Sequence, residues 1–183
     1  MCQRLSDART IRILVDEHGN LAFFPSAINP ARTPEMDSEE WSRKPPEMQE
    51  PPVIYSNHPI VLDAPYSSEQ IEECLREAAS SFNLYPAFSE KQIDMAQWYY
   101  KQKSFAKATK GKRMILLSLD PYMSHIGLML PWKRPAGYYM GIEDREIDYD
   151  ISFSDAVKII EDLISFDYEK SEYFNKNIKR FNL

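Results

Sequence analysis

The sequence has few of the residues that build disulfide frameworks, metal cages and catalytic triads. Among 183 residues there are two cysteines, three histidines and five glycines. Cys2 and Cys74 are too few for a disulfide framework or a zinc cage, so we expect free thiols in a reducing compartment. His18, His58 and His125 show no triad spacing to a serine, cysteine or carboxylate, and no pair makes a zinc site. The sequence therefore predicts no metal, no cofactor and no enzyme, with catalytic residues that meet only in the fold as the less favoured alternative.

Long apolar runs are absent as well. No stretch approaches eighteen consecutive apolar residues, and the first ten residues, MCQRLSDART, lack the apolar segment of a signal peptide. We therefore expect a cytoplasmic protein with no membrane contact. The chain is 43% hydrophobic and 13% aromatic, which is typical of one folded domain over residues 1–183.

Basic residues are concentrated in one short segment, although the net charge is -6. Residues 101–113, KQKSFAKATKGKR, hold six basic side chains and no acid, whereas residues 143–172 hold eleven acids and three basic side chains. The acidic segment is expected to repel nucleic acid and to attract a basic partner.

Two β-hairpins are predicted about one hundred residues apart along the chain. Apolar runs over 11–15 and 21–24 flank a five-residue turn that contains Gly19 and Asn20. Runs over 114–119 and 125–130 flank a second five-residue turn, which opens with Asp120 and Pro121. A helix with a capping box follows each hairpin, and its apolar residues stand at the same five offsets from the cap serine, Ser67 or Ser152. Two further strands are predicted over 137–142 and 145–151.

These patterns predict an α+β fold of two tandem antiparallel strand-rich repeats, each closed by a helix, with a connecting helix between them. Repeat one covers residues 10–82 and includes a proline-rich insertion over 26–52. The connecting helix covers 89–110 and begins with a capping box of Ser89 and Gln92, and Trp98 is expected to pack beneath it. Repeat two covers 113–165, and a helical tail covers 166–183.

The basic segment has three interpretations. It lacks the upstream glycine and the Ser or Thr after Gly111-Lys112 that a P-loop requires, which disfavours a nucleotide site. Basic residues beside aromatic residues are typical of single-stranded nucleic-acid binding, and the candidates are Lys107, Lys110, Lys112 and Arg113. The interpretation we favour is structural, since lysines suit the negative end of a helix that leads into a strand.

The acidic segment EDREIDYDI, residues 143–151, has alternating acidic and apolar residues. A strand here places the acids at 146, 148 and 150 on one face, either as a solvent-facing strand or as a docking face for a basic partner. No EF-hand spacing accompanies them, so no calcium site is expected. The candidate docking residues are Glu143, Asp144, Glu146, Asp148 and Asp150, with Trp41 of the proline-rich insertion as a further interface anchor.

Five segments outside the proline-rich insertion form a pattern over most of the chain. They are IRILVDEHGNLAFFP, PIVLDAPYSSEQIEECLREA, KSFAKATKGKRMILLSL, IGLMLPWKRPAGYYMGI and the closing capped helix. The pattern resembles the immunity proteins of bacterial contact-dependent growth inhibition, the CdiI group. Phe105 stands where those proteins usually carry tryptophan, and the proline-rich insertion is longer than theirs. The resemblance implies paired sheet-and-helix repeats similar to the Whirly fold.

The resemblance also implies a function. Such a protein binds and neutralises the C-terminal toxin domain of a large cell-surface CdiA-type protein and does no chemistry. We expect the toxin to be a nuclease, because nucleases are basic around the site that takes nucleic acid and an acidic surface complements that site. The alternative is a single-stranded nucleic-acid-binding protein of Whirly-like fold that uses the basic segment.

Overall fold

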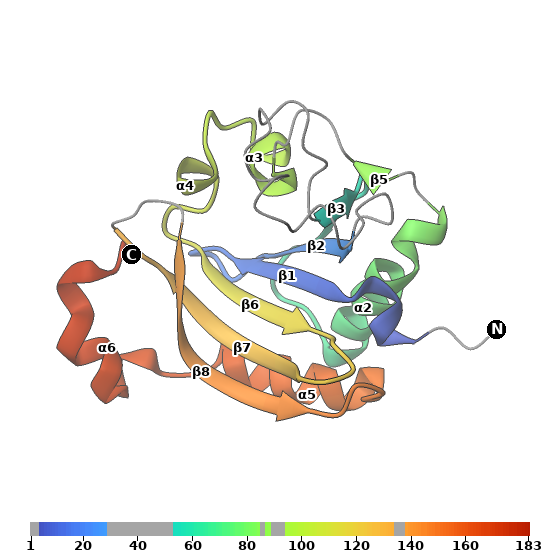
Figure 1. Ribbon diagram of the computed structural model, residues 1–183. Helices are drawn as coiled ribbons and strands as arrows, with labels where there is room; N and C mark the ends of the chain where they lie inside the picture. Colours follow the sequence, from blue (N-terminus) through green and yellow to red (C-terminus); the bar gives the residue numbers. More distant parts are fainter. Residues whose placement is uncertain (1–3, 29–52, 85–86, 89–93, 134–137) are drawn as a thin grey trace, which may run out of the picture.

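In the computed structural model the described residues are 4–28, 53–84, 87–88, 94–133 and 138–183. Within them the chain has an α+β fold, in which an antiparallel sheet carries two longer helices on one face and two short helices on the other (Figure 1). The α+β class and the antiparallel pairing are as predicted. The strands in sheet order are β5 (Ala87–Phe88), β3 (Val53–Ser56), β2 (Leu21–Ile28), β1 (Thr10–Val15), β6 (Arg113–Ser118), β7 (Ser124–Pro131) and β8 (Tyr139–Ile147), and β4 (Ile60–Leu62) also pairs with β2.

Both predicted hairpins are present. Strands β1 and β2 form the first hairpin, and β6 and β7 form the second. The first strands of the two hairpins pair with each other in the centre of the sheet, where Arg12 lies opposite Leu116. In the turn between β1 and β2, Gly19 has φ +83°, a left-handed conformation that glycine adopts without steric cost.

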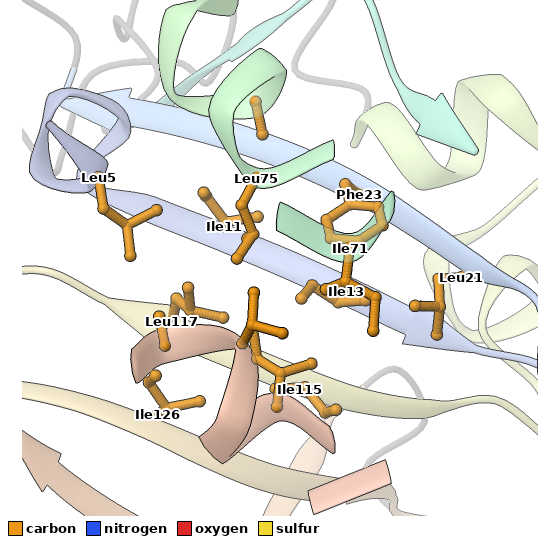
Figure 2. Close-up of a cluster of buried hydrophobic side chains, with 14 of the residues drawn as sticks. Leu5, Ile11, Ile13, Leu21, Phe23, Ile71, Leu75, Ile115, Leu117 and Ile126 are labelled. Carbon is orange, nitrogen blue, oxygen red and sulfur yellow. The ribbon is translucent and has the colours of Figure 1, made fainter. Parts of the chain in front are cut away.

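The larger hydrophobic core lies between the sheet and helices α2 (Ser68–Leu84) and α5 (Phe153–Ile164). Both predicted caps are formed: the Ser67 amide donates to the Gln70 side chain, and the Asp155 amide donates to Ser152 Oγ. Figure 2 shows Ile71 and Leu75 of α2 pointing into the cluster of strand residues. Because successive side chains of β1 and β2 point to opposite faces of the sheet, one apolar face of these strands packs in this core.

The opposite face of the sheet carries a smaller core beneath two short helices. Helix α3 (Met95–Tyr99) and helix α4 (Phe105–Ala108) cover β1, β2 and the adjoining end of β6, and Met95 packs with Leu14 and Phe24. The single connecting helix expected over 89–110 is therefore wrong for the described residues, because the chain turns at Lys101, where φ is +51°. Ser89 and Gln92 lie outside the described residues. Trp98 is 47% exposed rather than packed beneath a helix.

The second half of the sheet ends in one strand where two were expected. Strand β8 runs without a break from Tyr139 to Ile147, and residues 148–150 form a turn before α5. A bulge opposite Leu128 and Met129 bends β8, which lets one strand continue where the sequence indicated an interruption.

The remaining expected segments lie as follows. Residues 26–28 of the expected insertion belong to β2, and residues 29–52, including Trp41, lie outside the described residues. After α5, the tail forms the 3-10 helix η5 (Tyr168–Lys170), helix α6 (Glu172–Asn177) and the 3-10 helix η6 (Ile178–Arg180). A further 3-10 helix, η1 (Leu5–Ala8), precedes β1 at the other end of the chain. Phe174 and Phe181 of the tail pack on Leu130 of β7. In the described parts of the chain, no helix is both long and apolar enough to cross a membrane.

Candidate functional site

Strand β8 divides the predicted acidic residues between the two faces of the sheet. Glu143 lies opposite Leu128 of the larger core, and its carboxylate pairs with Arg145. Asp144 and Glu146 lie opposite Gly127 and His125, on the other face. The alternation of β8 therefore separates Glu143 from its acidic neighbours, and Asp144 and Glu146 share one face.

The alternating pattern ends two acids earlier than expected. Asp148 and Asp150 lie in the turn after β8, so the strand face predicted for residues 146, 148 and 150 is wrong beyond Ile147. Both side chains are nevertheless exposed. We name Asp144, Glu146, Asp148 and Asp150 the acidic surface, since these four exposed carboxylates follow one another along the end of β8 and the turn after it.

Two exposed apolar side chains lie at the same end of the sheet. Tyr122 is 98% exposed and Met123 is 68% exposed, in the turn between β6 and β7. Because Ser124 pairs with Ile147, this turn lies beside the residues that follow β8 (Figure 1). Neither residue was predicted as a contact residue, although an aromatic residue and a methionine in a short turn are a pattern that the sequence shows. Tyrosine is enriched at protein interfaces, so the turn adds apolar contact area to the acidic surface.

A hollow of about 410 Å³ lies on the sheet face that Asp144 shares. The lining residues come from β6, β7 and β8: Leu116, His125, Gly127, Met129, Gly141, Ile142, Glu143 and Asp144. Glu143 borders the hollow beside the bulge, where its backbone carbonyl lies near Gly127, although its side chain belongs to the opposite face. Leu116, Gly127 and Asp144 form one row across the three strands, and Met129 and Gly141 are paired nearby. The two glycines leave space in this face because neither has a side chain. We name this feature the sheet hollow.

The predicted basic residues are not brought together on one face. Arg113 donates to the Ile164 carbonyl oxygen at 3.0 Å. Ile164 is the last residue of α5, so this contact lies on the sheet face that α2 and α5 cover. The Lys112 ammonium lies 4.5 Å from the centre of the Tyr100 ring. Lys107 and Lys110 are exposed in and just after α4. Arg113 is therefore separated from Lys112, whose ammonium lies over a ring that packs against the smaller core.

A different basic cluster lies near the tail. Trp132, Lys133, Lys179 and Arg180 line a hollow of about 380 Å³, and the Arg180 guanidinium lies 5.8 Å from the Trp132 ring centre. This cluster was not predicted, because Trp132 and Lys133 are more than forty residues from Lys179 and Arg180 in the sequence and the two pairs meet only in the fold.

The remaining chemistry-bearing residues have packing roles or lie apart. No group of three or more His, Cys, Asp or Glu side chains is placed to hold a metal ion within the described ranges. Burial, with the charges of Glu77 and Glu73, raises the pKa of the Cys74 thiol to about 11. Cys74 is therefore a neutral thiol near pH 7 and packs against the larger core.

Comparison with family models, with curated proteins and with solved structures found no match to this chain.

Proposed function

We propose that this protein is an immunity protein that binds and neutralises one toxin domain delivered by contact-dependent growth inhibition, with a basic nuclease as the expected toxin. One observation carries the proposal: Asp144 and Glu146 share a sheet face, and Asp148, Asp150 and the exposed Tyr122 continue this surface at its end. The resemblance of the sequence segments to the CdiI group supports it independently.

The physical role of the acidic surface is recognition. Grouped carboxylates steer a basic partner into encounter and fix its orientation, and they add more to association rate and specificity than to affinity. Apolar anchors supply most of the binding free energy at interfaces of this kind. Tyr122 and Met123 are placed to be such anchors beside the carboxylates. Neutralisation of this type needs one binding surface and no catalytic residue.

The proposal includes a tandem relation between the two halves of the chain and a cytoplasmic site of action. The central pair, Arg12 and Leu116, is 104 positions apart, the spacing that separates the two hairpins in the sequence. Helices α2 and α5 contact each other on the same face of the sheet, and Ser68 Oγ donates to Glu161 at 2.6 Å. Both features are those expected of two repeats that pair through their first strands.

Single-stranded nucleic-acid binding is the alternative function. The separate environments of Arg113 and Lys112 weaken it, whereas the basic cluster around Trp132 favours it. A salt titration of binding to labelled oligonucleotides distinguishes the two functions, because phosphate contacts weaken steeply with salt. We expect no binding to oligonucleotides at physiological salt.

The proposed function is tested by growth protection. The proposal expects a reading frame for a large surface protein to end just upstream of the frame for this chain, and the C-terminal domain of that protein is produced in cells from an inducible promoter. We expect cells to stop growing unless this protein is co-produced, and we expect no protection against toxin domains from unrelated systems. The proposal is contradicted if cells that co-produce this protein still stop growing, or if the upstream frame encodes no toxic product.

A further inference from the structure

We propose that the sheet hollow receives one arginine side chain of the basic partner, with Asp144 as its counter-ion. The inference rests on the proposed function for the identity of the partner, and it names the place where that partner's key residue enters. It is carried by three features of the described residues: an uncovered part of the sheet, two strand glycines that open a hollow in it, and a carboxylate at the hollow.

The hollow lies where this face of the sheet is not covered by a described helix. The same face carries α3 and α4 over β1 and β2 (Figure 1). Leu116 and Met129 on β6 and β7 are only half-buried, and Met129 borders the smaller core. On the opposite face their strand neighbours Ile115 and Leu128 are fully buried beneath the helices. The sheet therefore presents an apolar floor to solvent at this place.

Neither of the two glycines is required by a left-handed backbone, although Gly141 borders the bulge in β8 and a Cβ at Gly127 would lie 3.3 Å from the Glu143 carbonyl oxygen. The glycines with positive φ in the described chain are Gly19 and Gly111, whereas Gly127 and Gly141 lie in strands β7 and β8. Glycine inside a strand costs stability and often marks a place where a ligand or another chain approaches closely. A Cβ added at Gly141 meets open space, and one added at Gly127 lies 2.9 Å from Asp144 Oδ1. The glycines thus keep the hollow open and let the Asp144 carboxylate lie over the strand.

An arginine fits these surroundings better than a purely apolar side chain does. Its aliphatic stem can pack on the apolar floor of Leu116 and Met129 while its charged head stays in contact with water and with Asp144. Its planar guanidinium forms paired, charge-assisted hydrogen bonds to a carboxylate, which Asp144 supplies. Glu146 lies two residues farther along β8 on the same face and adds to the negative potential at the hollow.

The first experiment uses a small probe and no toxin. Amide signals of the labelled protein are followed by NMR during titration with N-acetyl-arginine methylamide, and with the citrulline analogue as a neutral control of the same shape. We expect the arginine probe to shift the Gly127 and Gly141 amides in the millimolar range, and the citrulline probe to bind about 10-fold more weakly because it lacks the charge. Equal responses to both probes, or no shift at these glycines, overturn the inference.

The second experiment uses the toxin domain and a graded pair of variants. Gly141→Leu fills the hollow, whereas Gly141→Ala removes the glycine but leaves most of the space. We expect Gly141→Leu to weaken toxin binding about 30-fold, the scale of a lost interface anchor, and Gly141→Ala to weaken it about threefold or less. Asp144→Asn, which leaves the backbone unchanged, is expected to weaken binding similarly to Gly141→Leu, with Asp162→Asn on the exposed side of α5 as its control.

The outcomes separate the inference from the proposed function. If Gly141→Leu and Asp144→Asn bind the toxin as tightly as the wild type, the hollow is not the point of entry, while the immunity function stands. If the arginine probe binds the hollow but co-production gives no protection, the hollow is supported and the proposed function fails.

Discussion

Asp16 organises the turn between β1 and β2 through three hydrogen bonds to its carboxylate. Its Oδ1 accepts from the amides of His18 and Asn20 at 2.9 Å each, and its Oδ2 accepts from Asn20 Nδ2 at 3.0 Å. Burial opposes ionisation of Asp16, but these hydrogen bonds outweigh it and lower the pKa of the carboxyl below its ordinary value. The turn also contacts the segment between β4 and α2, because Asn20 Oδ1 accepts from the Ala64 amide at 3.0 Å.

Replacement of Asp16 by alanine tests this turn and its pH dependence. We expect a loss of about 1 kcal/mol in unfolding free energy at neutral pH, the scale of net hydrogen-bond loss. The folded pKa lies below the unfolded one, so the stabilisation is present above the unfolded value of about 4 and is lost as pH falls through the folded value. Urea unfolding of wild type and variant from neutral to strongly acidic pH measures the difference. A difference that stays constant down to the lowest pH contradicts the carboxylate's role.

Single residues also show where sequence patterns were sufficient. The alternation of β8 correctly placed Glu146 away from its apolar neighbour Ile147, because a strand has a fixed two-residue period. The pattern did not show where the strand ended, since the next three residues alternate in the same way but form a turn. Gly127 was visible within the run HIGLML, but its contact with Asp144 depends on a strand nearly twenty residues away.

Among the elements, those with strong local patterns were predicted and the short helices were not. The hairpins and the capped helices α2 and α5 follow from residues close in sequence. Helices α3 and α4 have five and four residues, too few to show a helical period, so their existence depends on contact with the sheet. Arg12 Nη1 lies 2.7 Å from Asp94 Oδ2, and Asp94 also caps α3 by accepting from the Ala96 amide at 2.8 Å.

The attachment of α3 is tested by two substitutions at this ion pair. The side chains of Arg12 and Asp94 are 13% and 18% exposed, so each charge depends on the other for solvation. We expect Asp94→Ala to lower the unfolding free energy by about 3 kcal/mol, because it leaves the Arg12 charge buried and removes the cap. Arg12→Met leaves the Asp94 carboxylate without its ion pair, but Asp94 still accepts the hydrogen bond from the Ala96 amide and the methionine packs between Tyr55 and Phe105, so we expect a smaller loss of about 2 kcal/mol. Urea unfolding gives both values, and a larger loss for Arg12→Met contradicts the assignment.

At the scale of the whole molecule, charge is divided between distant surfaces. The acidic surface lies at the end of β8 that leads to α5, and the basic cluster of Lys133, Lys179 and Arg180 lies beside the opposite end of β7 and β8, with the tail (Figure 1). The sequence indicated the division along the chain but not the basic cluster near the tail. An asymmetric charge distribution orients a basic partner as it approaches and presents the acidic end first.

The most direct test of toxin recognition by the acidic surface is a binding titration with the purified toxin domain. The double variant Asp144→Lys/Glu146→Lys is compared with Asp162→Lys/Glu169→Lys, which makes the same change in net charge at exposed positions away from this surface. We expect 1:1 binding by the wild type, about 100-fold weaker binding by the first variant, and a change of about threefold or less in the second. Equal weakening in both variants would show a response to net charge alone, and wild-type binding by Asp144→Lys/Glu146→Lys would contradict the central claim.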